Sequence, residues 1–557
     1  WMASLGAAGG LQGTAMRGNG FFRQTWVVSL VLPWVLLGAG CSVPPREPDL
    51  LRVGNGAEPA ALDPHLVSGV SEHRVLSALF EGLAMINPAT LEPEPAVAAR
   101  WEASPDGLVW RFHLDPDTRW SDGTPVTAGD FVYAWRRMLS PALGSEYAYM
   151  LHCLAGARAF NEGQTTDFST VGARALSDGV LEVQLDHPTP YLLKMQSHFA
   201  WYPVKAAAVE AAGRVDDRNN PWARPGTLVS NGPFRLAEWQ PNDQIRLERN
   251  PYYRRAGSVR LPGIVFYPVD NQQTEERLFR AGLLDLTSTV PRYKIPVYRQ
   301  RMPERLQSHP YLGTYFYRFN VTRSPLNDPR VRRALVMALD RKELAERVLK
   351  GGEIPADRLV PEGMAGYRPP EGIPYDPEGA RRLLAEAGYP EGRGMRGLDL
   401  LFNTSEAHRL IAEAAQRMWR ETLGIRVTLR NQDWKVYLAS MDSLDYDIAR
   451  SAWIADVPDA VNFLECFLAG GGNNRTGWSS ETYDQLIREA YREADPDRRA
   501  VLLARAEALL LDEAPIAPVY FYRWTFLMNP EVRGLVPNPL GFIRWTDLWL
   551  ERQEGGE

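Results

Sequence analysis

The stretch SAWIADVPD, residues 451–459, places one carboxylate directly after an apolar run rich in β-forming residues. This carboxylate belongs to Asp456, and the preceding segment 446–453 contains a single positive charge, Arg450. An isolated buried charge is very unfavourable, so a buried Asp456 needs a cationic partner. Three interpretations stay open: Asp456 pairs with Arg450, it caps the end of a strand, or it receives a cation that the chain captures.

Patterns of hydrolytic or metal chemistry are missing from the sequence. It has no G-x-S-x-G, H-E-x-x-H or G-x-x-x-x-G-K-[ST] pattern, and only 8 His. Cys153 and Cys466 are far apart and lack metal-ligand spacing, so they form either one disulfide or two free thiols. We therefore expect no enzyme activity, no cofactor and no metal, and a secreted peptidase is disfavoured.

Composition narrows the class further. A chain of 557 residues is too long for one ordinary domain, and 45% hydrophobic with 23% charged residues is typical of globular proteins. A formal charge of −6 argues against general nucleic-acid binding. The 17 Trp and 22 Tyr suit either a large core or a cleft lined with amphipathic rings.

We expect the first 49 residues to be a targeting segment and not part of the fold. Residues 1–40 combine upstream sequence, a start at Met16, a short basic region and the apolar run 26–37, which is typical of a secretory signal. Small residues before Cys41 resemble a bacterial lipobox, in which this cysteine becomes lipidated; the alternative is an ordinary signal with a coincidental cysteine. Residues 41–49 are a Pro-rich tether. We expect an exported protein, lipid-anchored on the periplasmic or outer face of a bacterial membrane.

Elements that must position Asp456 alternate between helix and strand patterns. Strands are predicted at 50–55, 108–115, 179–186 and 425–431, and helices at 71–83, 127–139, 328–349, 376–389 and 405–424. Thr127 with Asp130 makes a capping box, and Asp-Pro pairs open two of the helices. A last helix runs into an aromatic strand within 494–524. This alternation predicts an α/β fold.

Six segments carry a family resemblance in the expected order. They are WSDGTPVTAGDFVYAW (120–135), NGPFRLAEW to IRLERNPYY (231–253), DPRVRRALVMALDR (328–341), FNTSEAHRL (402–410), NQDWKVYL (431–438) and YDIARSAWIAD (446–456). The chain thereby resembles the extracytoplasmic solute-binding proteins of family 5, most closely the oligopeptide binders of ABC importers. The resemblance implies a two-lobed, three-domain periplasmic-binding-protein-like clamp of type II, α/β with mixed sheets and a hinge.

The same resemblance implies domain limits. Residues 50–84, 208–312 and 524–557 would form domain I of lobe 1, residues 85–207 domain II of lobe 1, and residues 313–523 lobe 2, or domain III.

It also implies a set of site residues. Asp456 matches the carboxylate that receives the peptide's α-amine, while Arg450 and His408 match cations that receive its carboxylate. Backbone contacts and side-chain pockets fall on Glu72, Tyr149, Asn403, Trp434, Trp453, Ile454, Ala455, Asn474 and Tyr522. The alternatives are core packing for Trp434, an ion-paired strand arginine for Arg450 and an exposed helix histidine for His408.

Two departures from the family pattern stand out. Ile454 and Gly313 occupy positions where some relatives have bridged cysteines, so that bridge is missing here. Phe316 and Arg318 replace a tyrosine and an acid that relatives often have, and Arg318 could change the charge preference of one pocket.

The resemblance implies an extracytoplasmic peptide-binding component of an ABC importer. It would act as a monomer, capture short peptides, and deliver them to a permease and ATPase complex, without nucleic acid. Alternatives are a binder of dipeptides, murein peptides or another small solute in the same family, and a peptide sensor or chaperone without a transport role.

Overall fold

The computed structural model describes residues 50–551 apart from Ser68 and Ala365, and it does not describe the side chains of Trp434 and Lys435. The predicted segments 1–40 and 41–49, with Cys41, lie outside the described residues, and so does the side chain of Trp434. All elements below belong to the single compact unit that begins at Asp49.

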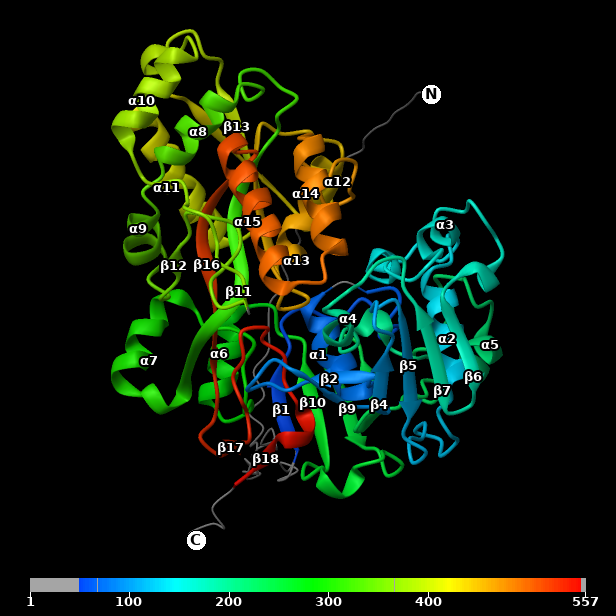
Figure 1. Cartoon of the computed structure of the whole chain (residues 1–557). Coiled ribbons are helices and arrows are strands. Elements are labelled where there is room, and N and C mark those ends of the chain that lie inside the picture. The colour runs from blue at the N-terminus through cyan, green and yellow to red at the C-terminus, as the bar shows by residue number, and fades with distance from the viewer. Residues whose placement is uncertain (1–49, 68, 365, 552–557) are drawn as a thin grey trace, which may run out of the picture. The chain divides into compact units, whose positions relative to one another are not determined.

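A four-stranded sheet joins segments that lie on both sides of a long insertion (Figure 1). Its order is β1 (Leu51–Gly54), β10 (Gly263–Tyr267), β9 (Gln244–Arg249) and β8 (Phe234–Gln240). Strand β1 runs parallel to β10, and the other neighbours are antiparallel. The strand predicted at 50–55 is confirmed. Helix α1 (Val70–Leu79) contacts β8 and is four residues shorter at its C-terminal end than predicted, because Phe80 is already extended.

The insertion has an antiparallel sheet of its own. Its order is β4 (Ala98–Ala103), β5 (Val109–Leu114), β7 (Val180–Gln184) and β6 (Ala173–Ser177). The antiparallel strands predicted at 108–115 and 179–186 are confirmed as the neighbours β5 and β7. Helix α2 (Ala128–Met138) contacts β6 and β7 and begins with the predicted capping box, in which the Thr127 amide donates to Asp130 Oδ2 at 2.8 Å.

A mixed sheet of six strands forms the second half of the fold. Its order is β12 (Ile354–Pro355), β16 (Ile516–Leu527), β11 (Leu306–Phe319), β15 (Ile448–Ile454), β13 (Leu398–Asn403) and β14 (Val427–Gln432). Strand β13 runs parallel to both β14 and β15, whereas the other pairs are antiparallel. Tyr315, Tyr317 and Trp419 are fully buried in the core that this sheet shares with its helices.

Strands β11 and β16 run through two of the predicted domain limits, 312/313 and 523/524. Their ladder shifts register between Pro310 and Thr314, at the first of these limits. The three large sheets otherwise fall within the three predicted domains. The domain limits themselves stay a prediction.

Helices around the six-stranded sheet include α8 (Pro329–Met337), α10 (Pro377–Glu386) and α11 (Glu406–Leu423). The predicted helices at 376–389 and 405–424 are confirmed as α10 and α11, and Gly424 ends α11 with a left-handed φ of 69°. The single helix predicted over 328–349 is wrong. It splits into α8, α9 (Arg341–Glu343) and a π-helical turn (Leu344–Leu349), because Asp340 accepts the amide of Glu343 and starts a new helix.

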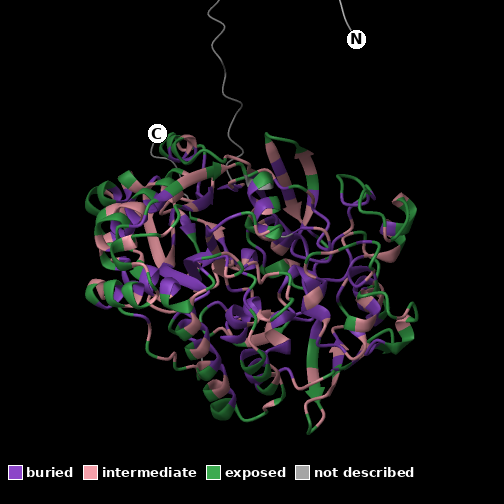
Figure 2. Ribbon diagram, turned by 90° about the horizontal axis from the view of Figure 1, so that it is seen from above, coloured by how far each residue is buried: buried purple, intermediate pink, exposed green. Residues whose placement is uncertain are grey.

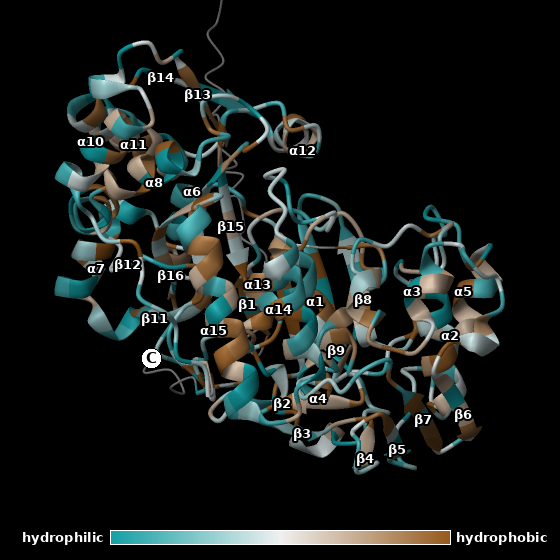
Figure 3. Ribbon diagram, turned by 45° about the horizontal axis from the view of Figure 1, so that its top comes forward, coloured by the Kyte–Doolittle hydropathy of each residue, from teal (hydrophilic) through white to brown (hydrophobic). Residues whose placement is uncertain are grey.

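The remaining elements are shorter or lie at the periphery. They are β2 (Ala84–Ile86), β3 (Pro93–Pro95), α3 (Ala157–Asn161), α4 (Leu192–Met195), α5 (Ala206–Ala212), α6 (Gln272–Arg280), α7 (Ile295–Arg301), α12 (Trp434–Asp442), α13 (Val461–Leu464), α14 (Glu481–Arg492), α15 (Pro496–Glu513), β17 (Val532–Arg533) and β18 (Trp549–Leu550). Buried residues lie mainly in the middle of the ribbon and exposed ones at its periphery (Figure 2), and the ribbon of α15 carries both hydrophobic and hydrophilic turns (Figure 3). Among residues 50–551, no helix combines the length and apolarity needed to span a bilayer.

Candidate functional site

Strand β15 has one edge that is only partly paired. Strand β11 pairs with it along its whole length, whereas β13 pairs with it at Ile448 and Ala449 and no further. The Ala455 amide donates to Leu312 O at 2.8 Å, so alternation turns the main-chain groups of Ala452 and Ile454 away from β11. Beyond Ala449, this edge therefore offers N–H and C=O groups that no described strand uses.

Asp456 follows directly after this edge and carries an unsatisfied oxygen. Its Oδ2 is buried and has no hydrogen-bond partner among the described residues, while its own amide donates to Asn462 Oδ1 at 2.9 Å. Burial, and then the nearby Glu465 carboxyl, raises the pKa of Asp456 to about 7, although Asn462 opposes the rise. A buried carboxyl in this state would gain strongly from a cation with N–H donors.

The described residues do not supply that cation. Nε2 of His198 lies 3.7 Å from Asp456 Oδ1, but burial and the neighbouring His73 hold the pKa of His198 well below its usual range, so the ring is neutral. Arg450 forms no ion pair with Asp456 among the described residues, so that interpretation is wrong. The Asp456 side chain also caps no described backbone N–H, and capture of a cation stays a prediction.

A second buried acid, Glu465, lies beside the first. Its oxygens accept from Tyr491 Oη at 2.8 Å and from Asn462 Nδ2 at 3.3 Å, and burial raises its pKa to about 7. The nearby Arg499 is occupied by Asp459, through two bonds of 2.8 and 2.9 Å. This end of the site therefore attracts positive charge. Sequence reasoning missed Glu465 because nothing in its local pattern places it next to Asp456.

Aromatic side chains of the insertion close this anionic end. Tyr149 stacks on Tyr147 with ring centroids 5.8 Å apart, and Tyr147 lies 4.8 Å from the ring of His198. Burial and the charge of Asp456 raise the pKa of Tyr149 well above its usual range, so the phenol stays neutral. Tyr149, predicted as a residue of the peptide pockets, thus lies near Asp456, while Tyr147 and His198 were not foreseen.

Four predicted residues meet at the other end of the free edge. Arg450 Nη1 lies 3.4 Å from Asn403 Oδ1, Nη2 lies 3.3 Å from Tyr522 Oη, and the guanidinium lies 5.2 Å from the ring of Tyr315. His408 is 5.6 Å from the same ring. None of these contacts involves a carboxylate, and Arg450 Nε is buried without a partner among the described residues. This end attracts negative charge.

His408 is a neutral member of this cationic end. Burial, then Arg450 and Arg292, lower its pKa to about 2, and its Nδ1 is buried without a described partner. The nearby Arg292 is hydrogen-bonded to Glu353. In the ligand-free protein His408 can therefore act through a neutral hydrogen bond, and the permanent positive charge comes from Arg450.

Of the remaining predicted residues, some belong to β15 and others hold local structure away from it. Trp453 donates from Nε1 to Asn462 Oδ1 at 3.2 Å, and Ile454 lies directly opposite Gly313 in the ladder. Glu72 accepts the Ala60 amide at 2.9 Å and the Ser71 hydroxyl at 2.8 Å, so it holds its own loop.

Asn474 is likewise occupied locally. Its amide donates to three carbonyls of its loop within 3.1 Å, those of Phe467, Leu468 and Trp478. Glu72 and Asn474 therefore hold local structure and do not enter the site proposed below.

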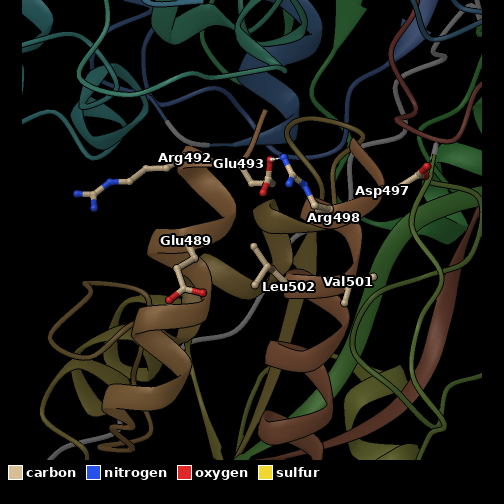
Figure 4. Close-up of a pocket in the computed structure, with 7 residues that line it drawn as sticks. All are labelled: Glu489, Arg492, Glu493, Asp497, Arg498, Val501 and Leu502. Atoms are coloured by element: carbon tan, nitrogen blue, oxygen red, sulfur yellow. Dashed lines mark hydrogen bonds and ion pairs between the residues drawn. The ribbon is translucent and has the colours of Figure 1, made fainter. Parts of the chain in front are cut away.

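Other features lie apart from this edge. A hollow of about 630 Å³ between α14 and α15 is lined by Glu489, Arg492, Glu493, Asp497, Arg498, Val501 and Leu502. Figure 4 shows Glu493 and Arg498 side by side among these residues, and Arg498 Nη2 donates to Glu493 Oε1 at 3.0 Å. Cys153 and Cys466 are free, buried thiols, and the described residues hold no cluster of metal-ligating side chains.

Comparisons with known proteins identify the family of the chain. The family model of bacterial extracellular solute-binding proteins, family 5 middle, matches residues 92–475. The periplasmic oligopeptide-binding protein OppA of Salmonella typhimurium is 36% identical over 508 residues, covering 89% of this chain and 91% of that protein.

Solved structures give the same result. The murein tripeptide-binding protein MppA of Escherichia coli matches with a TM-score of 0.82 at 33% identity, over 90% of this chain and 98% of that one. The unliganded open form of MppA matches with a TM-score of 0.72. OppA of Haemophilus influenzae in complex with the peptide RPPGFSPFR matches with a TM-score of 0.81 at 31% identity, over 91% of this chain and 100% of that one. These likenesses confirm the expected mixed α/β, type II clamp fold.

Proposed function

The chain belongs to family 5 of the bacterial extracellular solute-binding proteins, and on that premise we propose that it captures short peptides in extended form and delivers them to the permease of an ABC importer. The observation that carries the proposal is the buried, unpartnered oxygen of Asp456 at the end of a free strand edge. Asp456 would receive the peptide's α-ammonium group. This recognises a feature that all unmodified peptides share.

The peptide backbone would add a strand to the sheet. Ala452 and Ile454 would exchange main-chain hydrogen bonds with the peptide, which would run antiparallel to β15 from Asp456 towards Arg450. Trp453 and Ala455 belong to the same wall without facing the peptide backbone. Recognition of this kind is independent of side chains and therefore tolerates many sequences.

The C-terminal carboxylate would be received at the opposite end. Arg450 supplies the charge there, Asn403 and Tyr522 orient it, and His408 adds a hydrogen bond. Six residues of extended chain separate Arg450 from Asp456, which is about 20 Å between Cα atoms. Allowing for the reach of both side chains, roughly three to five peptide residues fit. This length favours oligopeptides over dipeptides as the ligand.

Delivery and anchoring complete the proposal. The clamp would close on the peptide, dock on the permease as a monomer, and be tethered to the membrane by a lipid on Cys41. Labelling of the full chain with radioactive palmitate in a bacterial host tests the anchor. Label should enter the wild type and be absent from Cys41→Ala, and equal labelling of both would remove the anchor from the proposal.

The main test is mass spectrometry of ligands that co-purify with the protein. Wild type should release a mixture of short peptides with free α-amines, and Asp456→Asn should release few or none. A matched control is Asp459→Asn, which removes a nearby carboxylate that is already paired with Arg499. A single non-peptide ligand, or an unchanged peptide mixture in Asp456→Asn, would refute the proposed function.

A further inference from the structure

Arg318 on β11 is buried without an acidic partner. It is 4% exposed, its Nε donates to Ser451 Oγ at 2.9 Å, and its Nη1 donates to the carbonyl of Asn473 at 2.5 Å. Its guanidinium also lies 5.6 and 5.8 Å from the rings of Phe316 and Phe467. No ion pair involves Arg318 among the described residues, and its Nη2 has no described hydrogen-bond acceptor.

Another buried arginine shows how a structural arginine is satisfied in this lobe. Arg332 is 3% exposed and also lacks an acid, yet all three of its nitrogens donate to carbonyls, those of Leu326, Glu513 and Ala514. Its position therefore needs no ligand. Arg318 differs because one of its nitrogens, Nη2, has no described acceptor for either of its two N–H groups.

The surroundings of Arg318 add positive charge and no free negative charge. Burial, and to a lesser degree the charge of Arg475, lowers the pKa of Arg318, so a second guanidinium lies nearby. The acidic groups around Arg318 are Tyr446, Tyr437 and Cys466, and burial raises the pKa of each, so all three are neutral. Asp442 pairs with Arg475 at 2.7 Å, and the Asp442 side chain is itself exposed.

Arg318 reaches towards the free edge of β15. It lies opposite Ala449 in the ladder and extends diagonally to Ser451, on the sheet face that also carries Phe316 and Trp453. A peptide strand added beyond Ala449 would place alternate side chains on that same face, next to Ser451. The Arg318 guanidinium would then be a lateral neighbour of one of those side chains.

We propose that Arg318 makes one pocket of this site select an acidic side chain, so that the preferred ligands are peptides carrying Asp or Glu at one interior position. This inference rests on the proposed function and adds the ligand's chemical class. A carboxylate there would accept from Nη2 in a charge-assisted bond and neutralise a buried cation. A neutral isostere would leave that cation unpaired.

The test is a scan of tetrapeptides by isothermal titration calorimetry. Tetraalanine is the reference, and single Glu or Gln substitutions at positions 2 and 3 give matched pairs that differ by one charge. Wild type should bind the Glu peptide at least tenfold more tightly than the Gln peptide at one of these positions. Arg318→Met should bring this ratio close to one while tetraalanine still binds. Arg318→Glu should prefer Lys at the same position.

The control is Arg341→Met, which removes another buried arginine whose partners are the carbonyls of Pro518 and Val336. It should keep the Glu preference. Equal affinities for Glu and Gln at both positions in wild type would overturn the inference without needing any variant, and so would a Glu preference that persists in Arg318→Met. Failure of wild type to bind tetraalanine would overturn the proposed function itself, which separates the two results.

Discussion

Asp456 should make peptide capture depend steeply on pH. In the ligand-free protein its pKa is about 7, raised by burial and by Glu465. The ionised form binds an ammonium group, so binding below pH 7 must release the proton first. At pH 5.5 about 3% of Asp456 is ionised, against about three quarters at pH 7.5. Allowing for partial loss of the ammonium proton at pH 7.5, affinity for trialanine should be about twentyfold lower at pH 5.5.

Ionisation of Asp456 with rising pH strengthens peptide binding but lowers the stability of the fold. An unfolded chain titrates this carboxyl near 4, so the raised pKa stabilises the fold fully below that pH and the contribution is lost as pH rises through about 7. The difference between the two pKa values corresponds to at most about 4 kcal/mol of unfolding free energy. This is an upper limit because 14% of the Asp456 side chain stays exposed and water relieves part of the cost of burial. Asp456→Asn removes this effect, so its ligand-free Tm at pH 8 should equal or exceed that of wild type.

Calorimetry at pH 5.5, 6.5 and 7.5 provides the assay. Titrations in two buffers of different ionisation enthalpy should show release of about one proton per peptide at pH 6 in wild type and clearly less in Asp456→Asn, where Glu465 is the carboxyl of this end that still has a pKa of about 7. His198, Tyr147 and Tyr149 face the same carboxyl, but all three are neutral across this range. A flat affinity profile in wild type, or the same slope in Asp456→Asn, would refute the reasoning.

Three further predictions follow from the same contacts. Glu465→Gln removes a negative charge beside Asp456, so its pH midpoint for peptide binding should fall below that of wild type, and calorimetry would contradict this if the midpoint stayed or rose. Arg450→Met should weaken trialanine about tenfold or more while leaving trialanine amide nearly unchanged, because the amide has no carboxylate to lose; equal losses would argue against Arg450 as its receptor. The pair Gly313→Cys and Ile454→Cys should form a disulfide, because directly opposed residues of a non-hydrogen-bonded pair have Cα atoms about 4.5 Å apart. Oxidation should raise the free energy of unfolding by about 2–4 kcal/mol relative to the reduced form. Free thiols after oxidation would show that the register of β11 and β15 is different.

Local signals in the sequence predicted most of the elements. The Thr127 box and the Asp376 cap fix helix starts through contacts within four residues, so α2 and α10 could be predicted from their own segments. The helix expected over 328–349 failed because Asp340 offers a competing cap inside a continuous helical pattern.

The site was only partly predictable. Asp456 and Arg450 were both singled out, but their relation was not, because an extended segment of about 20 Å, and no contact, separates two residues that are six apart. Glu465 and His198 reach Asp456 from different elements, and contacts of this kind leave no periodic signal in the chain. Glu72 shows the converse, since its loop satisfies a polar residue that sequence alone could not distinguish from a ligand contact.

The register shift between Pro310 and Thr314 has a consequence for how this protein can evolve. Leu312 lies inside that shift, and its carbonyl holds the amide of Ala455, the residue next to Asp456. Any rotation of the segment around Leu312 would therefore displace the carboxylate that we propose binds the amine. The affinity for the peptide and the equilibrium between conformations then both depend on the backbone around Leu312. Substitutions there should change both together, whereas substitutions of Arg450 or Arg318, which lie away from this segment, should change affinity alone.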